Sequence, residues 1–102
     1  MGKYTVELLL AAWQDIDRIS DVYLRLAGAA SAKKITDALL DTLARLGDFP
    51  YMGAQHPDPE LARREFRKVL CGDLVCVYKV IGQSVFVYRV VNGRTDYPQL
   101  LK

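Results

Sequence analysis

The sequence is poor in the residues that build familiar catalytic centres. Its 102 residues include one histidine, His56, and two cysteines, Cys71 and Cys76. A metal centre needs several closely spaced His, Cys or acidic side chains, and no such cluster is present. The sequence also has no glycine-rich phosphate loop and no Ser/His/Asp set at a recognisable spacing. We therefore expect no metal and no cofactor.

Long apolar runs are lacking as well. No apolar stretch of membrane-spanning length and no signal peptide is expected before the two cysteines. Both cysteines lie in apolar segments, where a cysteine is usually a small buried hydrophobic residue rather than half of a disulfide. The sequence predicts a reduced, cytoplasmic protein that makes no contact with a membrane.

The composition is that of one globular domain spanning residues 1–102. Half of the residues (51%) are hydrophobic and a quarter (25%) are charged. A chain of this length can bury one core but has no room for a second. We therefore expect a single domain.

Two segments have the periodicity of amphipathic helices. Between about Ala11 and Gly28, apolar residues recur three or four positions apart, and the predicted buried stripe is Trp13, Ile16, Ile19, Tyr23 and Leu26. Asp15, Asp17 and Asp21 fall mostly on the predicted solvent side. A second stripe, formed by Ile35, Leu39, Leu43 and Leu46, lies between Ser31 and Gly47. Since the connection is short, we expect an antiparallel helical hairpin.

Four segments are typical of strands, about residues 3–8, 65–71, 74–81 and 84–92. Gly72-Asp73 and Gly82-Gln83 separate the last three, as tight hairpin turns would. The proline-rich residues 48–62 predict a loop. The expected fold is α+β with the order β-α-α-β-β-β, in which the helical hairpin packs on one face of a mostly antiparallel sheet.

Both faces of this sheet are predicted to be apolar. One face carries Leu74, Cys76, Tyr78 and Val87, and the other carries Val75, Val77, Phe86 and Tyr88. The hairpin can cover one face, so we expect the other to bind a partner or a second copy of the chain. The alternative is that residues 48–62 and the C-terminal tail fold over it.

Charge is distributed unevenly along the chain. Residues 1–62 carry six Lys/Arg and nine Asp/Glu, whereas residues 63–102 carry eight and three. The basic half favours a polyanionic partner, either nucleic acid or an acidic protein segment, although an ordinary solvated face has the same composition. The residues that could hold such a partner are Arg63, Arg64, Arg67, Lys68, Lys79, Arg89 and Arg94.

Two further side chains could move protons. Tyr97 stands three residues after Arg94 and could act on the 2′-hydroxyl of RNA beside these cations. The simpler interpretation of Tyr97, which we favour, is a packing anchor for the tail. His56 could be a general acid or base, but a lone histidine in a loop is usually an ordinary surface residue.

Several short motifs, taken in order, resemble the toxins of the RelE/ParE superfamily. They are residues 29–35 at the start of the second helix, residues 46–53 after it, Arg67, residues 77–80 in the sheet and residues 90–101 at the end. The resemblance covers nearly the whole chain. It implies the toxin half of a bacterial type II toxin–antitoxin module of the plasmid-stabilisation kind, neutralised by a cognate antitoxin.

The resemblance leaves two targets open. RelE-like members cut messenger RNA on the ribosome as metal-independent endoribonucleases, and that mechanism would use Arg94, Tyr97 and Lys68 as catalytic residues. ParE-like members poison DNA gyrase. In either case Arg63, Arg64, Arg67, Lys79 and Arg89 would bind the nucleic acid or the target.

One departure from the RelE pattern bears on this choice. Val75 occupies the position of an arginine in RNA-cleaving members, and a valine cannot stabilise a phosphate. We therefore favour a ParE-like toxin that inhibits gyrase, with the ribosome-dependent nuclease as the first alternative. A degenerate copy that retains only antitoxin binding is the second alternative.

Overall fold

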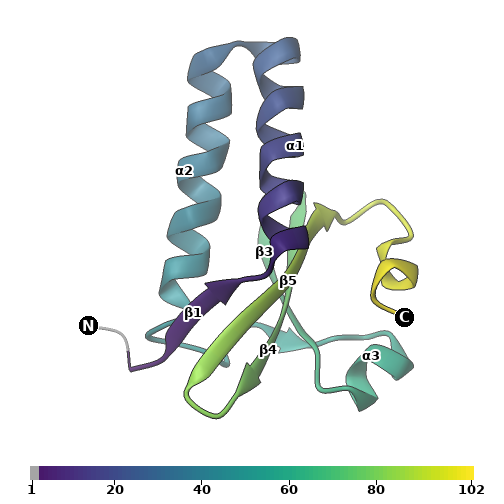
Figure 1. Cartoon of the computed structure of the whole chain (residues 1–102). Coiled ribbons are helices and arrows are strands. Elements are labelled where there is room, and N and C mark those ends of the chain that lie inside the picture. Colours follow the sequence, from purple (N-terminus) through teal and green to yellow (C-terminus); the bar gives the residue numbers. More distant parts are fainter. Residues whose placement is uncertain (1–2) are drawn as a thin grey trace.

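The computed structural model describes residues 3–102 and contains one five-stranded sheet with helical segments on both of its faces (Figure 1). The elements are β1 Thr5–Leu8, α1 Leu10–Ala27, α2 Ala29–Arg45, β2 Ala54–Gln55, α3 Pro59–Arg63, β3 Arg67–Cys71, β4 Leu74–Ile81, β5 Ser84–Asn92 and the 3-10 helix η1 Tyr97–Leu101. The predicted order of the main elements is confirmed. Within residues 48–62, predicted to be a loop, the chain forms the short elements β2 and α3, and the C-terminal tail forms η1. None of the helices in the described range is long and apolar enough to cross a membrane.

The sheet has the strand order β1-β5-β4-β3-β2. β1 runs parallel to β5, and every other pair is antiparallel. The two predicted hairpin turns are present, and Gly72 and Gly82 adopt φ angles of +59° and +60° that side chains other than glycine rarely tolerate. β1, the first strand along the chain, pairs with β5, the last one.

The helical hairpin is joined by a single residue, Gly28, whose φ of +93° again requires glycine. Its helices stand side by side and extend beyond the sheet (Figure 1). The predicted stripe of α1 is right at Ile16, which is buried, but wrong at Trp13 and Leu26, and the extension beyond the sheet accounts for Leu26. Trp13 is 47% exposed and Leu26 is 82% exposed.

The main core lies between this hairpin and one face of the sheet. Its buried residues include Ala12 and Ile16 from α1, Leu39 and Leu43 from α2, Leu46 after α2, and Leu74, Cys76, Tyr78, Val85, Val87 and Val90 from the strands. Cys76 and Cys71 are both free thiols, and burial raises the pKa of Cys76 to about 12. Cys76 therefore contributes no reactive thiolate.

The other face of the sheet is covered by the chain itself, which corrects the expectation of an open apolar face. A second buried cluster comprises Leu61 from α3, Phe66, Val75, Val77, Val91 and Tyr97 from η1. The alternative in which residues 48–62 and the tail fold over this face is the one observed. Burial of apolar area drives both segments onto the sheet.

A tight corner at Gly53 connects α2 to the sheet. The Gly53 N–H donates to the hydroxyl of the fully buried Tyr78 (3.0 Å), and the Gly53 carbonyl accepts from Arg67 Nε (2.9 Å). A Cβ at this position would lie 2.4 Å from the Lys68 carbonyl oxygen. The corner therefore requires glycine, and it fixes the start of the segment that covers the second face.

Candidate functional site

One edge of the sheet is left open where β1 ends. The final contact of this strand with β5 is the hydrogen bond from Leu9 N–H to the Val87 carbonyl (3.0 Å). Further along β5, the N–H of Val90 donates to Asp15 Oδ2 of α1 instead (2.9 Å). A helical carboxylate thus takes the place of the missing strand neighbour, and the edge N–H is satisfied.

Asp15 is also the centre of an ion-pair network. Arg89 donates to both carboxylate oxygens (Nε–Oδ2 2.7 Å, Nη2–Oδ1 2.8 Å), and Arg18 donates to Oδ1 (2.6 Å). A β-bulge, which leaves Tyr88 without a partner on β4, directs Arg89 towards the sheet edge. The carboxylate therefore carries a full set of partners.

Burial by itself raises the pKa of Asp15, but the hydrogen bonds from Arg89, Val90 and Arg18 outweigh it and leave that pKa below its ordinary value. The same pairing raises the pKa of Arg89. The predicted position of Asp15 on the solvent side of α1 is wrong, because its side chain is 2% exposed. Arg89, predicted as a target-binding cation, is held by its own chain.

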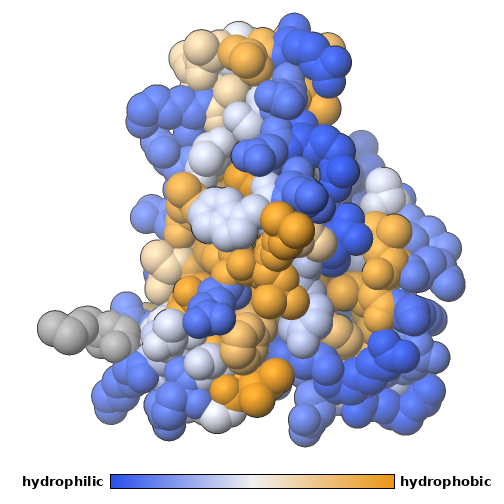
Figure 2. All heavy atoms as spheres, viewed as in Figure 1, coloured by the Kyte–Doolittle hydropathy of each residue, from blue (hydrophilic) through white to orange (hydrophobic). Residues whose placement is uncertain are grey.

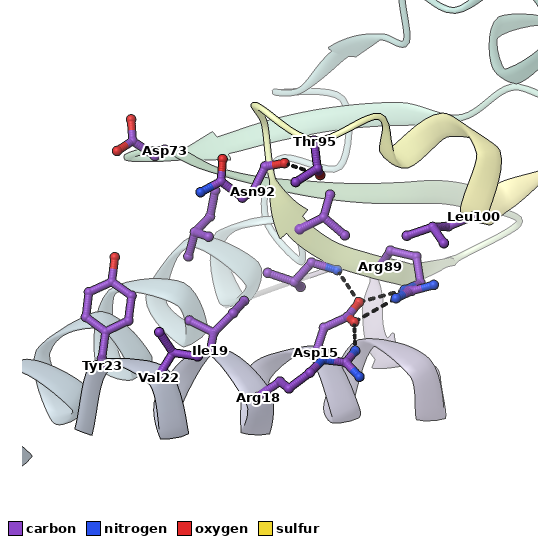
Figure 3. A pocket seen from close by; sticks show the side chains of 13 residues that line it. Asp15, Arg18, Ile19, Val22, Tyr23, Asp73, Arg89, Asn92, Thr95 and Leu100 are labelled. Carbon is purple, nitrogen blue, oxygen red and sulfur yellow. Dashed lines mark hydrogen bonds and ion pairs between the residues drawn. The ribbon is translucent and has the colours of Figure 1, made fainter. Parts of the chain in front are cut away.

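Beside this network lies a groove of about 540 Å³ between α1, the end of β5 and the tail. Figure 3 shows Ile19, Val22 and Tyr23 along the α1 wall, with Asn92 and Thr95 opposite and Leu100 beyond Arg89. The floor therefore combines apolar side chains with an edge of β5 that no strand covers.

His56 and Tyr97 form a buried pair on the second face. The Nε2 atom of His56 lies 2.8 Å from the Tyr97 hydroxyl, and Nδ1 accepts the Asp58 N–H (3.0 Å). Since Nδ1 is an acceptor, the proton of the neutral ring resides on Nε2, and His56 donates to the Tyr97 oxygen. Burial and the nearby Lys68 ammonium lower the pKa of His56. The ring is therefore a neutral hydrogen-bond donor.

Tyr97 is 7% exposed, in agreement with the favoured role of a packing anchor. Burial, with a smaller effect of Asp58, raises the pKa of its hydroxyl. The prediction of an exposed loop histidine is wrong, because His56 is 3% exposed. Lys68 lies near this pair on β3, whereas Arg94 is exposed beyond the end of β5.

Lys79 lies in a second pocket, of about 340 Å³, on the same face as Tyr97. Its ammonium stands 4.4 Å from the centre of the Phe66 ring and 5.7 Å from that of Tyr88, and these two rings pack edge to face. Among the described residues no carboxylate pairs with Lys79. Cation–π contact replaces an ion pair there.

The remaining predicted cations are dispersed. Arg63 is exposed on α3, and Arg64 donates to the Leu101 carbonyl (2.8 Å) and lies 3.4 Å from Glu60. Arg67, the first residue of β3, stacks on Tyr51 with its guanidinium carbon 5.2 Å from the ring centre. The structure thus groups Lys68 with His56 and Tyr97, and Lys79 with Arg64 and Arg89. Within residues 3–102 these cations form no continuous basic track.

Comparison with known proteins finds a family whose model matches most of this chain. The model of a family described as the ParE toxin of the type II toxin–antitoxin system parDE matches residues 6–97. No curated protein matches the sequence.

Several solved structures share the fold. A chain of the chromosomal ParDE system from P. aeruginosa has a TM-score of 0.75 and 20% identity, with 88% of this chain and 96% of that one covered. A chain of the RelBE2 toxin–antitoxin complex from Mycobacterium tuberculosis has a TM-score of 0.67 and 18% identity, covering 88% and 98%. The YoeB/ParE toxin from Agrobacterium tumefaciens has a TM-score of 0.57 and 17% identity, covering 86% and 96%.

Proposed function

This chain belongs to the ParE family of toxins from type II toxin–antitoxin systems, and from that premise we propose that it arrests growth by binding and inhibiting DNA gyrase. The proposal places the chain in the cytoplasm, where gyrase works, and gives it a cognate antitoxin that neutralises it. The toxin acts through its surface, without a metal or a cofactor.

The observation that carries the choice of gyrase is the filling of the second sheet face. Val75 stands where RNA-cleaving relatives are expected to carry an arginine, and it is 5% exposed among apolar neighbours. A phosphodiester could reach neither a cation nor open space at this point. The position supports a toxin that holds a protein rather than one that cuts RNA.

The state of Tyr97 supports the same choice. A tyrosine that exchanges a proton with a 2′-hydroxyl must approach the nucleotide within hydrogen-bond distance. Here Tyr97 is buried against the second sheet face, and His56 occupies its hydroxyl. Its raised pKa further disfavours a phenolate base at neutral pH. Tyr97 therefore stabilises the fold rather than the reaction.

Ribosome-dependent cleavage of messenger RNA is the second candidate, and one observation favours it. Lys68, His56 and Tyr97, from β3, the preceding loop and η1, come together on one face. Rearrangement of the tail on the ribosome would expose them beside a substrate, with Arg94 nearby in the sequence. In that case the chain is a metal-independent endoribonuclease.

Expression of the wild-type chain in cells carrying reporters for DNA damage and for translation tests the proposal. Inhibition of gyrase predicts early induction of the DNA-damage response while translation continues. Arrest of translation without DNA damage would favour the nuclease. Normal growth would favour the degenerate copy that retains only antitoxin binding.

A further inference from the structure

The Lys79 pocket contains a cation for which residues 3–102 supply no carboxylate partner. Lys79 projects from the middle of β4, is half-buried, and has aromatic rings rather than a carboxylate against its ammonium. A partly desolvated ammonium gains from a carboxylate more than an exposed one does. The pocket is therefore suited to an anion supplied from outside.

The other two cations at this pocket are already engaged. Arg89 is paired with Asp15, and Arg64 with the Leu101 carbonyl and Glu60. A nucleic-acid backbone needs a succession of free cations, because each phosphate adds a charge to be neutralised. A single free ammonium fits one carboxylate instead.

The residues around the pocket indicate which side chains the ligand carries beside its carboxylate. Leu9, just before α1, and Leu100, in η1, both line the pocket and are 36% and 57% exposed. Leu10 and Trp13, in the first turn of α1, are also exposed apolar residues. Figure 2 shows apolar side chains gathered at the base of α1 and again beside the C-terminal tail, with more polar residues between them. These surroundings favour large apolar side chains beside the carboxylate.

We propose that Lys79 anchors an Asp or Glu of the cognate antitoxin whose neighbouring apolar side chains cover Leu9 and Leu100. The inference rests on the proposed toxin function. An antitoxin is favoured over a transient partner because exposed apolar surface of this kind needs lasting cover. An acidic segment in that antitoxin would also complement the basic half of the chain, residues 63–102.

The test compares the affinities of wild-type, Lys79→Met and Lys3→Met proteins for the antitoxin encoded beside this chain, by calorimetry. Methionine keeps an unbranched apolar side chain and removes the charge, and thermal unfolding verifies that the variant folds. We expect Lys79→Met to weaken binding at least about 30-fold, the cost of breaking a buried charge pair. Lys3→Met, which alters an exposed lysine, should bind as the wild type does.

A scan of antitoxin carboxylates to amides identifies the partner residue. One substitution should weaken binding to the wild type and have little further effect on Lys79→Met. Equal affinities for wild type and Lys79→Met would overturn the proposal. So would a dimer of the chain alone that Lys79→Met dissociates, because the occupant would then be a second copy. Growth arrest by the wild type without antitoxin reports on the toxin function separately.

Discussion

Asp15 and Arg89 lie 74 positions apart in the sequence and form a bidentate ion pair, with N–O distances of 2.7 and 2.8 Å. The pair joins α1 to β5 at the point where β1 has ended. Because Asp15 also accepts the Val90 N–H, one carboxylate satisfies both a side chain and a strand edge. The contact therefore adds a polar link between the helical hairpin and the sheet edge, beside the main core.

Asp15→Asn should destabilise the fold by about 3–5 kcal/mol, because it leaves the half-buried Arg89 without its charge partner. Urea unfolding measures the loss. In the double variant with Arg89→Met the penalty should be smaller than the sum of the single effects. Additive effects would contradict the coupling. Lys33→Met, which breaks an exposed pair with Asp37, is the control and should leave the unfolding midpoint unchanged.

Gly53→Ala should cost about 2–4 kcal/mol, since a Cβ would overlap the Lys68 carbonyl and displace the buried Tyr78 hydroxyl. Gly72→Ala provides the comparison, because open space surrounds that position and only its positive φ opposes a side chain. It should cost about 1 kcal/mol. Equal unfolding midpoints for the two variants would contradict the steric explanation.

His56 should make stability depend on pH. Its pKa in the folded state lies below the ordinary value of 6.5, so the unfolded chain takes up a proton first. The stability contributed by the neutral ring is complete above pH 6.5 and is lost as the pH falls below it. Urea midpoints at pH 7.5 and 5.5 should therefore differ for the wild type. The difference should shrink in His56→Gln, and an unchanged difference would assign the effect to other groups.

Tyr97→Phe should leave growth inhibition intact while lowering stability by about 1–3 kcal/mol, because the buried Nε2–H of His56 loses its acceptor. Colony counts after induction, together with thermal unfolding, measure the two effects. Arg94→Ala is the matched variant at an exposed position and should alter neither. Loss of inhibition in Tyr97→Phe at unchanged stability would support the nuclease instead.

The sequence predicted the fold best where apolar residues repeat at a regular spacing and pack on the continuous surface of the sheet. Leu39 and Leu43 repeat at helical spacing along the sheet, and Gly72 and Gly82 occupy the turns that their positions predicted. The same periodicity failed for Leu26, because the hairpin extends past the sheet and the stripe there has nothing to pack against. Periodicity specifies which residues share a face, but not where the neighbouring element ends.

The candidate site was less accessible to such reasoning. The local sequence does not distinguish Asp15 from the exposed Asp17, and the partner of Asp15, Arg89, lies 74 positions away. The segment around Leu61 folds onto the sheet through a five-residue helix too short to show a period. One local signal was available: Asp58-Pro59 predicts a helix start, and the Asp58 carboxylate does cap α3.

The most direct test of the account is made with purified gyrase, supercoiled DNA and ATP, to which wild-type chain and Tyr97→Phe are added in turn. Trapped gyrase–DNA cleavage complexes are measured as linear DNA after denaturation of the enzyme. We predict that both proteins raise the linear fraction and that the cognate antitoxin abolishes the effect. Unaltered supercoiling with no trapped complex, alongside cleaved messenger RNA in arrested ribosomes, would contradict the central claim.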